Sequence, residues 1–371
     1  MKIKDKIIVQ LSSVHHSYDT RIYHKICKSL IENGYKVDLI IQHECDEIRD
    51  GVNVIALPIA KKKIDRLTKV LPTVLKKVNQ YPKGTIIHFH DPELIPFGYL
   101  FKLLGYKVVY DVHEDVPASI KSKSWIPKWL RIPVAIISSW FEKIAVILFD
   151  GIIVVVTDVG ERLKSTKTIM VQNFPILKDD VRFAEYKSDG NLFYVGDISR
   201  IRGAHEMVDL AEDISHLNIK KNLVLAGKFS PPSLENELKE KNGWGNTTYI
   251  GWINREELNK QLQNSCLGLV LLYPEPHHIR SQPNKLFEYM YGGIPIVSAD
   301  LPRYKEIIDE VGCGVTVNPL NRESILEGVK YILENPALAA KMGERGRKAV
   351  IERFNWDIEK MKLFKFYEEL I

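Results

Sequence analysis

Hydrophobic and polar positions follow two alternating patterns along most of this chain of 371 residues. Short runs that are apolar throughout, such as GIIVVV, are separated by longer stretches in which apolar residues recur every three or four positions. The first pattern is typical of strands in a parallel sheet covered by helices on both faces, and the second of amphipathic helices. Together they predict an α/β fold. In the first half, the predicted strands cover residues 6–13, 35–42, 52–58, 85–90, 107–112, 151–156 and 167–173.

The alternation is interrupted once, by the polar and irregular segment from Asn173 to Gly190, which we interpret as a linker. It then restarts, with strands predicted in the runs NLFYVG, NLVLAGK, TTYIGW, LGLVLLY, IPIVSA and GVTVN. Because 371 residues exceed the usual size of a single core, we predict two doubly wound, Rossmann-like domains, residues 1–175 and 176–354, that face a cleft. Residues 355–371 predict a final helix that can pack on either domain or cross back to the first.

The composition is ordinary for a soluble globular protein, with 45% hydrophobic and 27% charged residues. The four cysteines lie far apart, so neither a disulfide framework nor a zinc site is indicated. The apolar run near the N-terminus is too short for a signal peptide, and no stretch approaches the roughly 18 apolar residues of a membrane span. We therefore expect a cytoplasmic protein.

The charge is distributed unevenly. Residues 1–175 contain 26 Lys and Arg against 18 Asp and Glu, whereas residues 176–371 contain 26 against 29. Two basic, amphipathic segments, 61–78 and 121–149, lie in the first half, and the second combines aromatic with basic residues: Trp125, Trp129, Trp140, Lys121, Lys123, Lys128 and Arg131. This combination favours a peripheral contact with an anionic membrane surface. The alternatives are a chance imbalance and a core-facing helix with a solvated rim.

Polar residues follow several predicted strands of the first half, where ligands bind in open parallel sheets. The loop after the first strand contains His15, His16, Asp19 and Arg21. Asp19 can cap the next helix, and a cation in a first helical turn, as at Arg21, is a candidate for binding an anionic ligand. Later strands end at the pairs His90–Asp91 and His113–Glu114. We interpret His90 as a structural hydrogen-bonding residue and His113 as functional.

The second half places glycines and cations at its predicted strand ends. Gly196 is followed by Arg200 and Arg202, Gly227 by Lys228, and Gly251 by Trp252 and Ile253; the helix of SQPNKLFEYM adds Asn284, Lys285, Leu286 and Glu288. Lys285 and the amides near Asn284 could hold a diphosphate at the positive end of a helix. Glu288 could accept two hydroxyl groups, as a ribose requires. The alternative is a surface pair between Lys285 and Glu288.

Several stretches, in order, resemble bacterial family 4 glycosyltransferases of the cell-surface polysaccharide type: YDTRIYHKICKSLIENGYKV, YDVHED, YVGDISRIRGAHEMV, YIGWINREELNKQLQNSCLGLVLL and PNKLFEYMYGGIPIVSAD. The resemblance implies the GT-B fold, with the final helix on the first domain. It also implies transfer with retention from a UDP- or GDP-sugar to a glycan acceptor, expected to be lipid-linked, without a metal or other cofactor.

The resemblance assigns residues to three roles. Catalytic residues would be His113, Arg202 and Lys285. Donor-binding residues would be Gly196, Arg200, Lys228, Ile253, Asn284, Leu286, Glu288 and Arg280. Acceptor-binding residues on the first domain would be His15, His16, Asp19, Arg21 and Glu114.

The chain departs from the family pattern at two positions near the expected donor site. Arg280 stands where many members have a glutamate, and Asp197 stands where an arginine usually follows the glycine. Arg280 could favour a donor that bears a carboxylate, or could turn outward. These departures leave two other functions open: a sugar-nucleotide epimerase, and a non-catalytic nucleotide-sugar-binding partner of another transferase.

Overall fold

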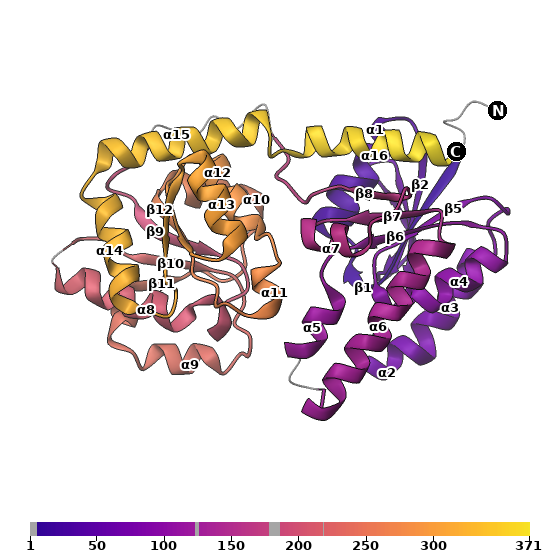
Figure 1. Cartoon of the computed structure of the whole chain (residues 1–371), viewed down its shortest axis with the longest axis horizontal. Coiled ribbons are helices and arrows are strands. Elements are labelled where there is room, and N and C mark those ends of the chain that lie inside the picture. The colour runs from indigo at the N-terminus through magenta and orange to yellow at the C-terminus, as the bar shows by residue number, and fades with distance from the viewer. Residues whose placement is uncertain (1–5, 123–125, 178–185, 218) are drawn as a thin grey trace. The chain divides into compact units, whose positions relative to one another are not determined.

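The computed structural model describes residues 6–122, 126–177, 186–217 and 219–371. The chain divides into two compact units (Figure 1): Met1–Asn173 with Trp356–Ile371, and Phe174–Asn355. Part of the predicted linker, residues 178–185, lies outside the described residues, as do Lys123 and Trp125 of the aromatic, basic segment. Each unit is an α/β structure built on its own sheet, as the alternating pattern predicts.

The first unit contains a sheet of eight strands in the order β3-β4-β2-β1-β5-β6-β7-β8. All neighbours pair in parallel except β3 and β4, which are antiparallel. The strands are β1 (Ile7–His16), β2 (Lys36–Gln42), β3 (Glu47–Arg49), β4 (Val52–Leu57), β5 (Ile86–Phe89), β6 (Lys107–Val112), β7 (Gly151–Val154) and β8 (Thr168–Met170). Only β3 was not predicted, because this short edge strand has no run of apolar residues.

Helices cover the sheet of the first unit, and the last of them comes from the end of the chain. They are η2 (Thr20–Cys27), α1 (Lys28–Glu32), α2 (Lys63–Asp65), η3 (Arg66–Val70), α3 (Leu71–Val78), η4 (Pro92–Leu94), α4 (Ile95–Leu103), α5 (Val116–Ser122), α6 (Lys128–Leu148), α7 (Thr157–Arg162) and α16 (Trp356–Leu370). In α16, Trp356 Nε1 donates a 2.8 Å hydrogen bond to Ser29 Oγ, and Tyr367 is fully buried. These contacts make α16 part of the first unit.

The second unit contains a parallel sheet of six strands in the order β11-β10-β9-β12-β13-β14. The strands are β9 (Asn191–Val195), β10 (Leu223–Ala226), β11 (Thr247–Tyr249), β12 (Ser265–Val270), β13 (Ile296–Ala299) and β14 (Gly314–Val317). After β9, the strands β10 and β11 are added on one side of it, whereas β12, β13 and β14 are added on the other side. Strand order therefore reverses between β9 and β12, which is where open α/β sheets bind ligands beyond the carboxyl ends of their strands.

Helices on both faces complete the second unit and bury its two apolar clusters. They are η5 (Arg200–Arg202), α8 (Ala204–His216), α9 (Leu234–Lys239), η6 (Asn242–Asn246), α10 (Arg255–Gln263), α11 (Pro276–Ile279), α12 (Asn284–Gly292), α13 (Pro302–Val311), α14 (Arg322–Leu333) and α15 (Pro336–Glu352). Helix α12 packs on β12 with Leu286, Phe287, Tyr289 and Met290 buried. This packing places the N-terminal turn of α12 near the strand ends.

Candidate functional site

Two glycine loops form the floor of a hollow at the strand ends of the second unit. Gly196 follows β9 and Gly227 follows β10, with φ angles of +126° and +147°. A Cβ atom on Gly227 would lie 1.8 Å from the carbonyl oxygen of Gly196, so no larger residue fits there. These loops, with Lys228, Trp252 and Ile253 among the other lining residues, surround a hollow of about 280 Å³. The backbone is thus open to a ligand at this edge.

Lys285 lies beside this hollow as a buried cation without a hydrogen-bonding partner. Its side chain is 9% exposed, and its Nζ has no hydrogen-bond partner among the described residues. The Nζ atom lies 3.6 Å from the ring centre of Tyr194, and a Cβ atom on Gly196 would lie only 3.2 Å from it. Burial, together with the charge of Arg202, lowers the pKa of Lys285 well below its usual value. Because an unpaired buried ammonium is unfavourable, an anion would stabilise this site.

Arg202 is the second cation of this site, whereas Arg200 is not. Arg202 Nη1 would lie 4.0 Å from a Cβ atom on Gly196, and its Nε is 3.9 Å from the carboxylate of Asp197. Arg200, which was predicted to add charge here, instead forms an ion pair with Glu237 and is more than half exposed. Glu237, which lies in α9, thus compensates the charge of Arg200. The structure therefore brings Arg202, but not Arg200, to Lys285.

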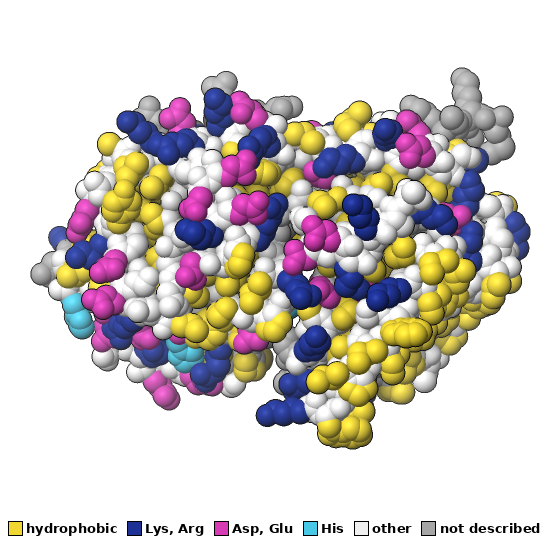
Figure 2. Space-filling view, in the orientation of Figure 1, with side chains coloured by type: hydrophobic (Ala, Val, Ile, Leu, Met, Phe, Trp, Pro, Cys, Tyr) yellow, Lys and Arg dark blue, Asp and Glu magenta, His cyan; other side chains and the backbone are white. Residues whose placement is uncertain are grey.

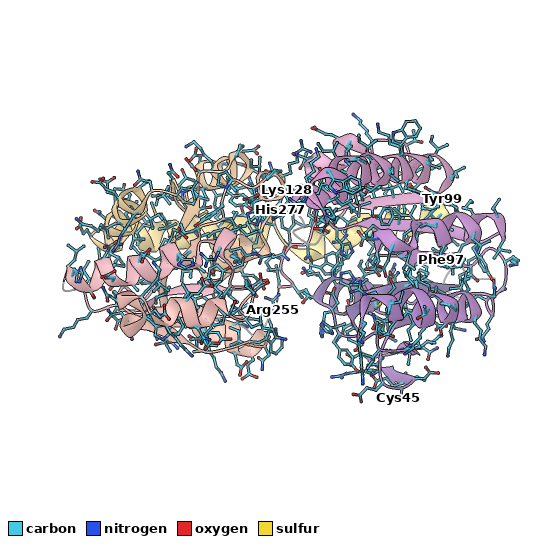
Figure 3. All side chains as sticks on the ribbon, turned by 90° about the horizontal axis from the view of Figure 1, so that it is seen from below. Cys45, Phe97, Tyr99, Lys128, Arg255 and His277 are labelled. Atoms are coloured by element: carbon cyan, nitrogen blue, oxygen red, sulfur yellow. The ribbon has the colours of Figure 1, made fainter. Side chains whose placement is uncertain are left out.

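Glu288 is paired with a residue that the sequence did not indicate. Its Oε2 lies 2.6 Å from Nη1 of Arg255, the first residue of α10. Arg255 is labelled in Figure 3. The predicted alternative, a surface pair between Lys285 and Glu288, is wrong, because Lys285 is buried and Glu288 binds Arg255. The capping box of Asn254 and Glu257 indicates where α10 begins. Nothing in the local sequence, however, indicates that Arg255 reaches α12.

The remaining predicted donor residues differ in their exposure. Lys228, Asn284 and Arg280 are exposed, with Arg280 at the C-terminal end of α11. Leu286, predicted to bind the donor, is instead 0% exposed in the apolar core, because it faces the sheet. Only its backbone is left to contact a ligand.

His278, next to this region, was not singled out from the sequence. It is 4% exposed, and its Nδ1 lies 3.0 Å from the carbonyl oxygen of Tyr273. Burial and the neighbouring positive groups, His277 first and then Arg202 and Lys285, lower the pKa of His278 to about 4. A neutral His278 adds no charge to the two cations already present. Two adjacent histidines after Pro276 form no periodic pattern, so nothing in the sequence indicated that His278 is buried near this site.

In the first unit, Arg21 lies in a buried ion pair and does not face a ligand. Its Nε and Nη2 atoms donate hydrogen bonds of 2.9 and 2.8 Å to the two carboxylate oxygens of Asp111, and both side chains are at most 4% exposed. The prediction that Arg21 binds an anionic ligand is therefore contradicted by this geometry. Burial alone would raise the pKa of Asp111, but Arg21, together with His113, holds it well below the usual value. Asp111 thus stays ionised.

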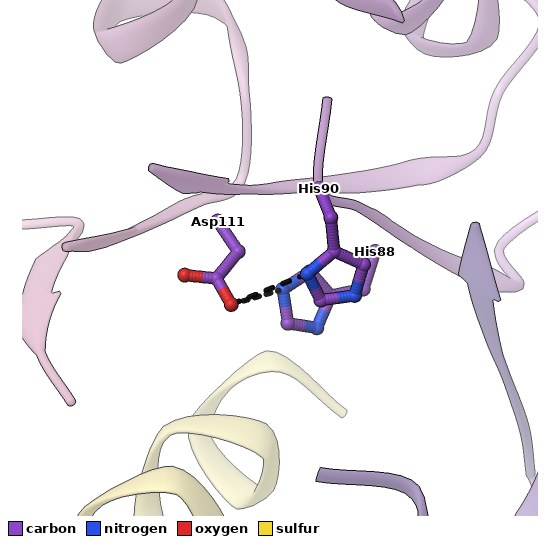
Figure 4. A group of neighbouring side chains, drawn as sticks. All are labelled: His88, His90 and Asp111. Atoms are coloured by element: carbon purple, nitrogen blue, oxygen red, sulfur yellow. Dashed lines mark ion pairs between the residues drawn. The ribbon is translucent and has the colours of Figure 1, made fainter. Parts of the chain in front are cut away.

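Three histidines surround the Asp111 carboxylate, and two of them are shown with it in Figure 4. Atoms of His88, His90 and Asp111 that could bind a metal ion lie within 4.8 Å of one another. His90 Nδ1 and His113 Nε2 are each 3.3 Å from Asp111 Oδ2. Both oxygens of Asp111 already accept hydrogen bonds from Arg21, and its positive charge opposes a second cation. The cluster is thus better suited to hydrogen bonding than to metal binding.

The end of β1 brings together some of the predicted acceptor residues. His15 Nδ1 lies 3.0 Å from Asp91 Oδ1, and the other oxygen of Asp91 accepts a 2.8 Å hydrogen bond from Ser12. Burial would raise the pKa of Asp91, but His15 and these hydrogen bonds hold it at about 2. The residues His15 and His16 line a hollow of about 350 Å³.

The other two predicted acceptor residues lie in different settings. Asp19 caps η2, because its Oδ1 accepts hydrogen bonds from the amides of Arg21 and Ile22, which is the capping role that the sequence offered as an alternative. Glu114 is exposed, next to the half-buried His113. Within the predicted acceptor set, His15 and His16 thus share one hollow.

Helix α6 presents an apolar ridge on the first unit (Figure 2). We define the α6 ridge by its most exposed hydrophobic residues: Trp129, Ile132, Ile136, Ile137, Trp140 and Ile147, each at least 53% exposed. Lys128 and Lys121 are also exposed near its N-terminal end. The predicted alternative of a core-facing helix with a solvated rim does not describe this helix, whose buried residues are only Ala135, Glu142 and Ala145. Among the described helices, none is long and apolar enough to cross a membrane.

Known families match both units. Residues 20–170 match the family described as Glycosyltransferase Family 4, and residues 177–349 match the family described as Glycosyl transferases group 1. A stretch of 109 residues is 27% identical to the uncharacterized glycosyltransferase MJ1607 of Methanocaldococcus jannaschii. That alignment covers 29% of this chain and 27% of the archaeal protein.

Solved structures resemble the chain along its full length. A sucrose-phosphate synthase from Thermosynechococcus elongatus has a TM-score of 0.77 at 19% identity, over 99% of each chain. HepE from Anabaena, solved with UDP and glucose, has a TM-score of 0.69 at 13% identity, over 98% of this chain and 100% of the other. The fold is therefore GT-B, as predicted, and the chain is a glycosyltransferase. More narrowly, it combines a family 4 domain in the first unit with a group 1 domain in the second.

Proposed function

We propose that this protein is a retaining glycosyltransferase that moves a sugar from a UDP- or GDP-sugar to a lipid-linked glycan in cell-surface polysaccharide synthesis. The observation that carries this proposal is the buried ammonium of Lys285, which has no hydrogen-bond partner among the described residues and lies beside Arg202 and the glycine loops. A diphosphate supplies the missing negative charge. HepE, which shares the fold, is solved with UDP and glucose, and this supports a nucleotide-sugar donor.

Each group at the donor site has a proposed task. Lys285, Arg202 and the amides at the start of α12 stabilise the diphosphate as negative charge develops on it. Glu288, oriented by Arg255, accepts hydrogen bonds from the ribose hydroxyls, and the backbone of Ile253 contacts the base. Because two cations and the helix amides already neutralise the leaving group, the transfer needs no metal at this position.

The reaction proposed for this site breaks one bond and forms another on the same face of the sugar. The bond from the anomeric carbon to the diphosphate oxygen breaks, and the acceptor hydroxyl oxygen bonds to that carbon. The hydroxyl proton passes to the departing diphosphate, so the step requires no protein nucleophile. His113 is proposed to contact the donor sugar or the reacting centre.

We also propose that the α6 ridge contacts the anionic surface of a membrane, where a lipid-linked acceptor is found. Exposed aromatic and aliphatic residues beside lysines are the composition of an interfacial helix. The exposed Ile64 and Leu67 of the basic segment 61–78 add to this surface. The protein should sediment with vesicles that contain anionic lipid, and less with neutral vesicles.

The membrane proposal has a matched pair of variants. Replacing Trp129 and Trp140 with serine should reduce sedimentation with anionic vesicles severalfold, because both rings are more than 60% exposed. Replacing Trp252, which is also 68% exposed but lies in the second unit, is the control. Equal binding by the ridge variant and the wild type would contradict the proposal.

The donor site is tested by thermal shift and by transfer. A panel of UDP-, GDP-, ADP- and dTDP-sugars should identify a donor that raises the unfolding temperature. With that donor, Lys285→Ala should lower transfer at least about tenfold, which corresponds to about 1.4 kcal/mol of transition-state stabilisation. Unchanged turnover would refute the diphosphate role. Interconversion of the donor without an acceptor would instead indicate an epimerase, and donor binding without transfer to any acceptor a non-catalytic partner.

A further inference from the structure

A continuous chain of hydrogen bonds crosses the first unit from Tyr367 in α16 to His113 after β6. Gln10 Nε2 donates a 2.9 Å hydrogen bond to the Tyr367 hydroxyl, and Gln10 Oε1 lies 2.9 Å from His90 Nε2. His90 Nδ1 lies 3.2 Å from His113 Nε2. Tyr367, Gln10 and His90 are at most 2% exposed, so water does not compete for these groups. Each bond therefore constrains the direction of the next.

The directions follow from what each group can donate. The amide nitrogen of Gln10 already donates to the Tyr367 oxygen, so the Tyr367 hydroxyl gives its own proton to His88 Nδ1, 2.6 Å away. The oxygen of Gln10 can only accept, so His90 carries its proton on Nε2. Burial lowers the pKa of His90 to about 4 despite the nearby Asp111, so the ring is neutral at pH 7. With its proton on Nε2 toward Gln10, its Nδ1 has a lone pair.

The same argument disfavours a metal ion at His88 and His90. With the Gln10 amide as it lies, His88 carries its proton on Nε2, the nitrogen that faces Asp111 at 3.9 Å. Reversing the amide would free His88 Nε2 but would put a proton on His90 Nδ1 instead. In either arrangement, one of the two histidines turns an N–H group toward the carboxylate. A metal ion needs a lone pair from each ligand.

This chain of hydrogen bonds determines whether His113 presents a hydrogen-bond donor or an acceptor to a ligand. A lone pair on His90 Nδ1 and the ionised oxygen of Asp111, at 3.2 and 3.3 Å, both require a proton on His113 Nε2. Arg21 keeps that carboxylate ionised and in place through two hydrogen bonds. The other nitrogen of His113, Nδ1, has no hydrogen-bond partner among the described residues, and the side chain is 21% exposed. In the neutral ring, Nδ1 is then an acceptor.

We propose that Gln10, His90 and Tyr367 are positioning residues that hold His113 with its proton on Nε2, so that its Nδ1 accepts a hydrogen bond from a hydroxyl group of the donor sugar. This inference rests on the proposed function, in which His113 contacts that sugar. It specifies the ligand group as a hydroxyl, because a carboxylate would require a donor at this position. Reversal of the Gln10 amide would move the proton of His90 to Nδ1 and leave Asp111 alone to favour a proton on His113 Nε2.

The tautomer of His113 can be measured without any assay of transfer. Nitrogen-15 NMR of the full chain labelled at histidine, at about pH 8, distinguishes a proton on Nε2 from one on Nδ1, because ordinary histidines are neutral there. We expect the Nε2–H form of His113 in the wild type. Gln10→Leu removes the acceptor of His90 and should shift His113 toward the Nδ1–H form, whereas Gln10→Glu keeps an acceptor there and should preserve the wild-type form.

Tyr367→Phe is the second variant, since it removes the hydroxyl that orients the Gln10 amide. Tyr35→Phe is its control: Tyr35 is also buried, with its ring centre 6.3 Å from that of Tyr367, but its hydroxyl has no hydrogen-bond partner among the described residues. Thermal unfolding shows that each variant is folded. The inference is overturned if wild-type His113 has its proton on Nδ1, or if neither Gln10→Leu nor Tyr367→Phe changes its tautomer.

Transfer kinetics with the donor found in the thermal-shift panel separate this inference from the proposed function. Gln10→Leu should lower kcat about fivefold, the value of one neutral hydrogen bond, with little change in the KM of the donor. If the tautomer shifts as expected but neither Gln10→Leu nor His113→Ala changes kcat, the role of His113 toward the sugar is refuted. If Lys285→Ala has no effect on transfer, the diphosphate site fails instead, and the NMR result still stands.

Discussion

Arg21 and Lys285 are two buried cations at the strand ends of their respective sheets, yet only Arg21 has a hydrogen-bond partner among the described residues. Arg21 donates two hydrogen bonds to Asp111, whereas Lys285 has none among the described residues. Sequence reasoning treated both as candidates for binding an anion. The difference shows that a buried cation indicates a ligand site only when the protein leaves its charge uncompensated.

The two cations also differ in what they contribute to stability. Removing one member of the Arg21–Asp111 pair leaves the other charge buried and unpaired, so the folded protein loses stability. Lys285 is different, because its burial and the charge of Arg202 outweigh the favourable charge of Asp197 in the ligand-free protein. Holding a proton on Lys285 therefore opposes folding, and a bound anion favours the protonated form. This contrast leads to five tests, given from the largest expected effect to the smallest.

The largest effect is expected for Arg21→Met. This change leaves the Asp111 carboxylate buried without its cation and should destabilise the protein by about 3–5 kcal/mol, measured by urea denaturation. The control is Arg200→Met, since the exposed pair of Arg200 with Glu237 should contribute at most about 1 kcal/mol. Similar losses in both variants would remove the distinction between a buried structural pair and a surface pair.

Lys285→Met should separate stability from activity. Methionine keeps most of the side-chain volume but removes the buried charge, so the ligand-free protein should become more stable by about 1 kcal/mol. Transfer should fall at least about tenfold, because the diphosphate loses a cation. A ligand-free variant that is less stable than the wild type would show that the ammonium is satisfied after all.

Donor binding should take up a proton at Lys285. Burial lowers the pKa of Lys285 in the free protein, and a bound diphosphate raises it again. Between these two pKa values, donor affinity should fall as the pH rises, by at most about tenfold per pH unit. Calorimetry in two buffers with different ionisation heats measures the uptake. No uptake by the wild type, or the same uptake by Lys285→Met, would contradict this assignment.

The free protein should show the opposite trend in stability. A lysine whose pKa is lowered by folding binds fewer protons in the native than in the unfolded state. Its contribution to the free energy of unfolding therefore rises with pH, from the lowered pKa up to the ordinary value near 10.4. The comparison of wild type with Lys285→Met isolates this contribution.

Arg255→Met should have the smallest effect. Without its 2.6 Å ion pair to Arg255, Glu288 is less well oriented toward the ribose, so the KM of the donor should rise about threefold, with kcat little changed. Glu288→Gln provides the comparison, because it weakens the same contact from the other side. A rise in KM for Glu288→Gln but not for Arg255→Met would show that Arg255 does not orient the carboxylate.

The alternating pattern predicted most of the fold because it reflects short-range requirements. Apolar runs identified all the described strands except β3, whose three residues carry no such run. The prediction that Lys285 and Arg202 lie close together is also confirmed. It rested on the rule that the carboxyl ends of parallel strands meet at one edge of the sheet. The side chain of Leu286, which was predicted to bind the donor, instead lies in the apolar core because it faces the sheet.

The sequence by itself determined the α/β class, the two halves and the strand ends at which chemistry is possible, because these depend on local periodicity and on glycines. Only the tertiary structure decided which charges are compensated: Asp111 lies 90 positions from Arg21, and Arg255 lies in a different helix from Glu288. No local pattern records such pairings, since they depend on which strand ends and helix ends meet. The unpaired charge of Lys285 is likewise a property of the folded chain.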